Sequence, residues 1–200
     1  MTLSKISDSN DHLVLQISPV WEMSADSFFD FCQLNSHLRI ERTATGKLII
    51  MSPAGSETGN RNFKLIQQLA NWTDRDGSGI GFDSSAGFAL PNGSTRSPDA
   101  SWIKLTKWNN LSAQQKTKFA PICPDFVVEL RSPSDNLKML QDKMQEYINN
   151  GVSLGWLIDR TTRQVHIYTP NSEVNSLDNP QTISGEPILS GFVLDLAKIW

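Results

Sequence analysis

The stretch from Phe126 to Arg131 constrains the fold of this chain more than any other segment. Its richness in Val and Phe is typical of a buried strand. Because side chains of a strand alternate between two faces, Glu129 and Arg131 share the face opposite Leu130. An isolated ionised carboxylate inside a sheet is costly, so Glu129 requires a cationic partner, either a side chain or a metal ion.

Helical and strand patterns alternate along the rest of the chain. Residues 1–23 are expected to form an N-terminal arm, loose up to residue 18, and residues 24–200 a single domain. This order of elements predicts an α/β or α+β fold, with a mixed sheet covered by helices. The pattern predicts helices over residues 24–34, 56–73 and 134–149, strands over 37–42, 47–51, 81–90, 100–105, 126–130, 154–158 and 164–168, a helix or loop over 106–118 and a loop over 171–180.

Composition narrows the class of protein. With 200 residues, 38% of them hydrophobic and 20% charged, the chain is typical of one globular domain. No segment approaches the roughly 20 apolar residues that span a bilayer. The N-terminus is polar, so a cytoplasmic location without membrane contact is expected. A net charge of −3 argues against a protein that coats nucleic acid, although acids gathered in a metal site also lower the total.

The chain has few Cys and His residues from which a metal site could be built. Cys32 and Cys123 do not form a CxxC pair, and the chain has 3 histidines. Both cysteines are interpreted as small packed residues. Any resident metal ion is therefore expected to bind carboxylates.

The dipeptide Pro98-Asp99 supplies a second acid. Pro cannot donate a ladder hydrogen bond, so it marks the start of the strand over residues 100–105. Asp99 can then point towards a neighbouring strand and meet Glu129. Paired carboxylates suit Mg²⁺, with Mn²⁺ as a substitute, and such an ion polarises a phosphodiester and activates a bound water.

Two cations are candidates for the third member of the site. Arg131 stands two residues after Glu129 and stays protonated, so it can stabilise charge but cannot act as a base. Lys143 flanks the apolar stripe of the next predicted helix and can reach inwards over the sheet. We expect Lys143 to be the catalytic lysine and Arg131 to clamp a phosphate or carboxylate. Glu57 is either an extra metal ligand or an acid that favours its helix N-terminus.

These motifs resemble the Uma-type restriction endonuclease family, which is placed in the PD-(D/E)XK nuclease superfamily. The resemblance covers nearly the whole chain from Ser24 onwards. The matching segments are 51–55, 97–99, 123–135, 142–147, 151–152, 155–159 and 190–192.

The family resemblance implies a restriction-endonuclease-like mixed sheet flanked by helices and Mg²⁺-dependent hydrolysis of DNA phosphodiesters. It makes Asp99 the aspartate of the PD pair and Glu129 the second acid. The chain has Glu-Leu-Arg where the motif has Glu-x-Lys. A lysine carried by the following helix is familiar in the superfamily, and Lys143 fits that position.

Three functions follow as hypotheses. The first is a Mg²⁺-dependent DNA endonuclease that uses Asp99, Glu129, Lys143 and Arg131. The second is a catalytically inactive module that binds nucleic acid, suggested by the altered motif and the negative charge. The third is an oligomeric interaction module, most simply a homodimer, in which apolar hairpins near Trp156 pair between chains.

Overall fold

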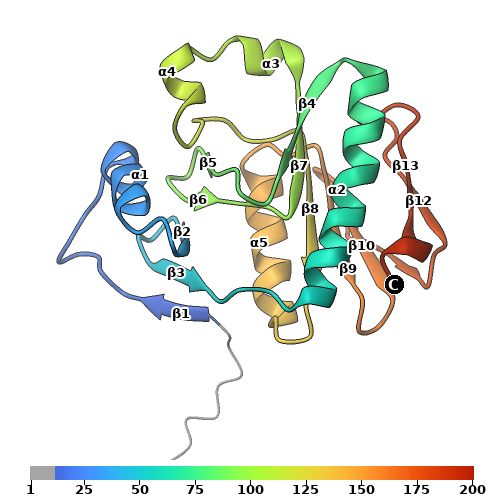
Figure 1. Cartoon of the computed structure of the whole chain (residues 1–200), viewed down its shortest axis with the longest axis horizontal. Helices are drawn as coiled ribbons and strands as arrows, with labels where there is room; N and C mark the ends of the chain where they lie inside the picture. The colour runs from blue at the N-terminus through green and yellow to red at the C-terminus, as the bar shows by residue number, and fades with distance from the viewer. Residues whose placement is uncertain (1–11) are drawn as a thin grey trace, which may run out of the picture.

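The computed structural model describes residues 12–200 and contains a central mixed sheet of six strands. Its order is β11-β10-β9-β8-β7-β4 (Figure 1). β8 and β9 are parallel, and the other neighbours are antiparallel. The strands are β4 (Gly79–Asp83), β7 (Ala100–Lys104), β8 (Phe126–Arg131), β9 (Leu154–Asp159), β10 (Gln164–Tyr168) and β11 (Asn175–Asp178).

Two helices cover opposite faces of this sheet, α2 (Ser56–Asp76) and α5 (Leu137–Asn149) (Figure 1). Trp72 of α2 belongs to the same buried cluster as Phe126 of β8. Tyr147 of α5 belongs to the cluster that contains Val127, the next residue of that strand. Successive side chains of β8 therefore enter two different cores, one on each face of the sheet. Glu129 follows Val127 by two residues, so its side chain lies on the same face, which α5 covers.

A second sheet of five strands lies beside α5, in the order β1-β3-β2-β6-β5. Helix α1 (Ala25–Leu34) packs on it through the buried Phe28, and Ser24 caps that helix by accepting from the Ser27 amide. The strands are β1 (His12–Leu15), β2 (Arg39–Arg42), β3 (Leu48–Met51), β5 (Phe88–Ala89) and β6 (Thr95–Arg96).

Short elements complete the molecule. The polar segment 106–118 carries helices α3 (Leu105–Asn109) and α4 (Ala113–Lys116). The C-terminal segment adds the hairpin β12 (Thr182–Ser184) and β13 (Val193–Asp195), followed by the 3-10 turn η1 (Leu196–Lys198). Among the helices described for residues 12–200, none has the length and apolar character needed to cross a membrane.

The fold class is confirmed, and so are both predicted hairpins, which are β2–β3 and β9–β10. The single strand predicted over 81–90 is wrong, because β4 and β5 belong to different sheets. Asp83 ends β4 by accepting hydrogen bonds from the backbone and hydroxyl of Ser85, which turns the chain. The loop predicted over 171–180 contains β11, an edge strand whose polar sequence carries little strand signal.

The structure also corrects three smaller predictions. Part of the predicted loose arm forms β1, and residues 1–11 of that arm lie outside the described residues. Asn136, rather than Ser134 or Asp135, caps α5 by accepting from the Met139 amide. The hairpin near Trp156 offers no free edge in the described chain, since Trp156 is fully buried and β11 pairs with the outer side of β10.

Candidate active site

Glu129 lies near the end of β8 and faces α5. Its side chain is 6% exposed. Apolar neighbours on both sides of the strand make burial of this position favourable for the sheet, while the carboxylate itself has to find polar partners. The structure therefore places an acid where the fold must supply a cation or hydrogen-bond donors.

Asp99 immediately precedes β7, the strand adjacent to β8. Ala100 of β7 pairs with Val128 of β8 in an antiparallel register, so continuing that register by one residue places Asp99 opposite Glu129. Residues opposite each other in such a pair project on the same face, with Cβ atoms about 5 Å apart. Asp99 Oδ2 accepts from the backbone amide of Leu130 at 2.8 Å, which fixes its carboxylate against β8.

Lys143 of α5 completes the group that the sequence predicted. Its Nζ lies 2.8 Å from Glu129 Oε1. One helical turn later, the Tyr147 hydroxyl donates to the same oxygen at 3.1 Å. Helical spacing puts both side chains on the face of α5 that covers β8.

Glu41 of β2 and Arg96 of β6 also belong to this site, and the sequence patterns did not identify them. Glu41 Oε1 lies 2.9 Å from Lys143 Nζ and accepts from the Ser97 amide at 3.0 Å. Arg96 donates to Glu41 Oε2 at 3.0 Å and to Glu146 Oε2 at 2.6 Å. The second sheet thus joins the central sheet through a buried chain of alternating charges.

Burial and charge separate the pKa values of these acids. Burial raises the pKa of Glu129 to about 7, with Asp99 and Glu41 adding to the rise and Lys143 opposing it. Burial also raises the pKa of Asp99. Glu41 is buried as well, but Lys143 and Arg96 outweigh that effect and lower its pKa to about 2. An additional cation near neutral pH therefore stabilises the ionised form of Glu129 more than that of Glu41.

The amine of Lys143 stays charged in this environment. Burial alone lowers its pKa, but Glu129 and Glu41 raise it above the ordinary value. A protonated lysine donates hydrogen bonds and stabilises negative charge, and it does not accept a proton.

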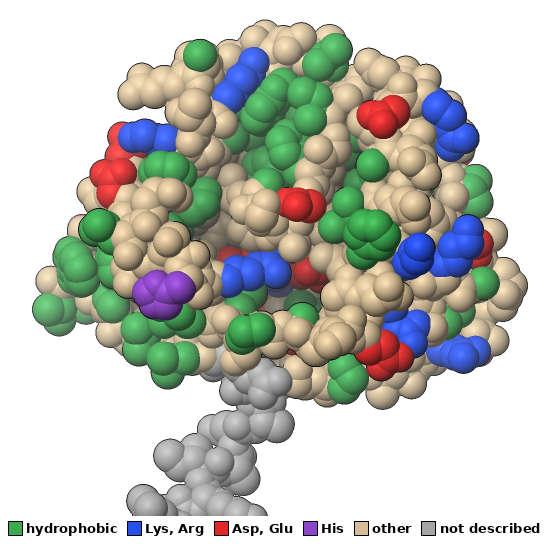
Figure 2. Space-filling view, viewed as in Figure 1, with side chains coloured by type: hydrophobic (Ala, Val, Ile, Leu, Met, Phe, Trp, Pro, Cys, Tyr) green, Lys and Arg blue, Asp and Glu red, His purple; other side chains and the backbone are tan. Residues whose placement is uncertain are grey.

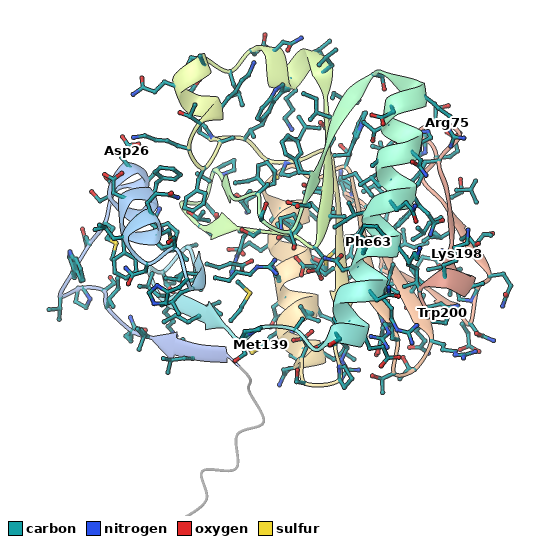
Figure 3. The ribbon with its side chains drawn as sticks, in the orientation of Figure 1. Asp26, Phe63, Arg75, Met139, Lys198 and Trp200 are labelled. Atoms are coloured by element: carbon teal, nitrogen blue, oxygen red, sulfur yellow. The ribbon has the colours of Figure 1, made fainter. Side chains whose placement is uncertain are left out.

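The site opens into a cavity of about 1120 Å³. Its walls include the first turn of α2, the loop from Ser132 to Asn136, and Met139 near the start of α5 (Figure 3). Acidic and basic side chains are visible within a hollow in the middle of this face (Figure 2). The cavity gives Asp99, Glu129 and Lys143 access to a substrate.

The other two predicted site residues are engaged elsewhere. Glu57 lines the cavity, but its exposed carboxylate forms a short ion pair with Arg61 and lies 3.6 Å from Arg160. Arg131 forms an ion pair with the buried Asp159 at 2.8 Å, its partner in the parallel register of β8 and β9. Glu57 lies in the first turn of α2, as expected of an acid that favours the helix N-terminus, and Arg131 holds a carboxylate, that of Asp159. The roles of Glu57 as a metal ligand and of Arg131 as a phosphate clamp would require release from these partners.

The donor set suits a hard divalent cation. Within residues 12–200, no group of three or more His, Cys, Asp or Glu side chains is arranged to hold a metal ion. Asp99 and Glu129 nevertheless provide two facing carboxylates, and Mg²⁺ is commonly held by one or two carboxylates while it keeps several waters. The contacts of Glu129 fall on Oε1, and the backbone amide of Leu130 donates to Asp99 Oδ2. Asp99 Oδ1 lies 4.0 Å from Arg39, so a cation would compete with this guanidinium for that oxygen.

The structure is a mixed α+β fold in which helices flank the central sheet. A solved structure with the same fold is described as "Crystal structure of a putative nuclease belonging to DUF820 from Anabaena variabilis ATCC 29413 at 1.96 A resolution". The two chains share 16% identity with a TM-score of 0.70, over 89% of this chain and 97% of that one. At that identity the likeness establishes the fold alone.

The sequence profile of the Uma2 family, described as "Putative restriction endonuclease", matches residues 25–197. The chain belongs to the Uma2 family. Among curated proteins no match was found. Family and fold together support a nuclease.

Proposed function

We propose that this protein is a Mg²⁺-dependent endonuclease that hydrolyses phosphodiester bonds of DNA. The observation that carries the proposal is the convergence of Asp99 and Glu129 from neighbouring strands, with the Lys143 ammonium 2.8 Å from Glu129. Mn²⁺ is expected to substitute for Mg²⁺, because both favour oxygen ligands.

Each residue has a chemical task in this proposal. Asp99 and Glu129 hold the cation, which when bound polarises the phosphodiester and makes a bound water more acidic. Lys143 donates to the attacking water and stabilises the charge that develops on the phosphate. Tyr147 orients Glu129 through its hydroxyl.

The cavity also supplies positive charge for the substrate backbone. Arg39, whose side chain is 41% exposed, lines it and lies 4.0 Å from Asp99 Oδ1. Guanidinium groups bind phosphate with two parallel hydrogen bonds. Arg131, predicted as a phosphate clamp, has to leave Asp159 before it can take that part.

Cleavage of supercoiled plasmid DNA tests the proposal. Wild-type protein with Mg²⁺ or Mn²⁺ is expected to nick the plasmid, and EDTA is expected to stop the reaction. Glu129→Ala should abolish nicking, while Glu173→Ala, which removes an exposed acid outside the cavity, should not. Equal nicking by wild type and Glu129→Ala would show that another residue or a contaminant performs the chemistry.

A catalytically inactive nucleic-acid-binding module is the second candidate. It is favoured by the ion pairs of Lys143 with Glu129 and Glu41 and of Arg96 with Glu41, which give both acids a cationic partner without a metal ion. Calorimetry with Mn²⁺ and with a short DNA duplex separates the two functions. DNA binding without metal binding or cleavage would favour the inactive module.

A homodimer is also proposed, now through β1 rather than the hairpin near Trp156. β1 is an edge strand of its sheet, and its residues Leu13, Val14 and Leu15 are 58%, 43% and 39% exposed. Exposed apolar edge strands are ready sites for pairing with another chain. Light scattering tests this proposal: twice the chain mass is expected, and a monomer of 22.3 kDa would exclude the dimer.

A further inference from the structure

The Lys143 ammonium is shared by two carboxylates from different sheets. Its Nζ lies 2.8 Å from Glu129 Oε1 on β8 and 2.9 Å from Glu41 Oε1 on β2. The lysine side chain is 12% exposed, and both acids are less exposed still. An ammonium in such a position depends on its protein partners, because little water reaches it.

The two carboxylates are held very differently. Glu41 receives a guanidinium hydrogen bond from Arg96 and a backbone hydrogen bond from Ser97, each at 3.0 Å. Arg96 is itself fixed by Glu146 on α5. Glu129 receives the Tyr147 hydroxyl on the same oxygen that faces Lys143. Both acids line the cavity, but Glu41 is anchored by these two donors, whereas Glu129 is the acid placed opposite Asp99.

A divalent cation at Asp99 and Glu129 competes with Lys143 for Glu129. The cation adds positive charge beside the ammonium, and like charges repel strongly in a buried site. If Lys143 had only Glu129 as a partner, metal binding would leave a buried ammonium unpaired at a large energetic cost. Glu41 prevents that cost because it keeps the amine paired.

We propose that Glu41 is a positioning residue that retains the Lys143 ammonium beside the site when a divalent cation takes over Glu129. Glu41 itself does not ligate the cation in this arrangement. The inference rests on the metal site of the proposed function and deepens it. It explains why an acid from a separate sheet reaches a lysine on α5.

Calorimetric titration with Mn²⁺ at pH 8, in the absence of DNA, tests the proposal. Glu41→Gln should weaken Mn²⁺ binding by roughly 10- to 100-fold, the usual effect of losing a partner that supports a metal ligand. Glu41→Asp keeps the charge but shortens the side chain, so it should weaken binding as well. Lys143→Met removes the competing cation and should tighten binding. Thermal melting identifies any variant that does not fold.

The double variant Glu41→Gln with Lys143→Met gives the decisive comparison. If Glu41 acts through the lysine, Glu41→Gln should have little effect on Mn²⁺ affinity once Lys143 is absent. Asp142→Asn is the matched control, since Asp142 precedes Lys143 and is an exposed acid paired with Lys138. This control loses the same charge and should bind Mn²⁺ within about twofold of wild type.

Three results would overturn the inference. Equal weakening by Glu41→Gln with and without Lys143 would make Glu41 a direct ligand or a source of general negative potential. Unchanged affinity in Glu41→Gln and Glu41→Asp would remove its role while leaving the metal site intact. No Mn²⁺ binding by the wild-type protein would overturn the proposed metal site and this inference together.

Discussion

Replacing Glu129 with Gln should remove a pH-dependent loss of stability from the metal-free protein. Burial is the largest cause that raises the pKa of Glu129 from 4.5 to about 7. A carboxyl group with a raised pKa binds more protons in the folded state, so the free energy of unfolding falls as the pH rises from about 4.5 to about 7. The difference between these pKa values corresponds to a change of about 3 kcal/mol in the free energy of unfolding.

Neither Glu41 nor His166 obscures this effect. Lys143 and Arg96 overcome the burial of Glu41 and lower its pKa to about 2. Its contribution to the free energy of unfolding is therefore complete above pH 4.5 and is lost as the pH falls through about 2. Burial lowers the pKa of His166, which makes stability rise with pH, but His166 is present in wild type and variant alike. The difference between the two proteins therefore reports Glu129 together with the groups that interact with it, Asp99, Glu41 and Lys143.

Urea denaturation in EDTA between about pH 5 and pH 8 measures this difference. From the low to the high end of this range, Glu129→Gln should gain about 2.5 kcal/mol relative to wild type. Glu173→Gln, a change at an exposed acid, should follow the wild-type profile. A difference between Glu129→Gln and wild type that stays constant with pH would refute the reasoning.

Three further substitutions have distinct expected outcomes. Tyr147→Phe removes the buried hydroxyl that donates to Glu129 and should cost about 1–2 kcal/mol in urea denaturation; a loss below the error of the fit would contradict that contact. Arg131→Met leaves Asp159 buried without its cation and should cost about 3 kcal/mol while Mn²⁺ affinity in calorimetry stays unchanged; the opposite result would restore Arg131 to the site. Asp99→Asn keeps an oxygen for the backbone amide of β8, so the melting temperature should hold while Mn²⁺ binding is lost; retained binding would exclude Asp99 as a ligand.

The parts of the site that came from local sequence patterns were accessible without a structure. Glu129 interrupts an apolar strand, Asp99 follows a proline at the start of another, and Lys143 flanks the apolar stripe of a helix. Strand parity and helical spacing are sufficient to place each of these side chains on a face. The structure brings the three faces together.

Glu41 and Arg96 were missed because their role depends on contacts between two sheets. Glu41 lies 55 positions from Arg96 and 102 from Lys143 along the chain. Its local sequence, Arg-Ile-Glu-Arg, has three charged residues and one apolar residue and is typical of a solvated strand. A buried acid cannot be distinguished from an exposed one by that pattern.

The partner of Arg131 could not be predicted for a related reason. Its spacing from Glu129 suggested a shared site, but no local pattern sets the register between β8 and β9. In the parallel pairing Arg131 lies directly beside Asp159, which takes its guanidinium. The division of residues 81–90 between two sheets is equally non-local, since only tertiary pairing separates β4 from β5.

A crystal soaked in Mn²⁺ and measured for anomalous scattering tests the paired-acid site most directly. We predict one strong peak in contact with both Asp99 and Glu129, with the amine of Lys143 moved from Glu129 towards Glu41. Peaks confined to other positions, with Lys143 still on Glu129, would contradict the assignment of these two acids as the metal-binding pair.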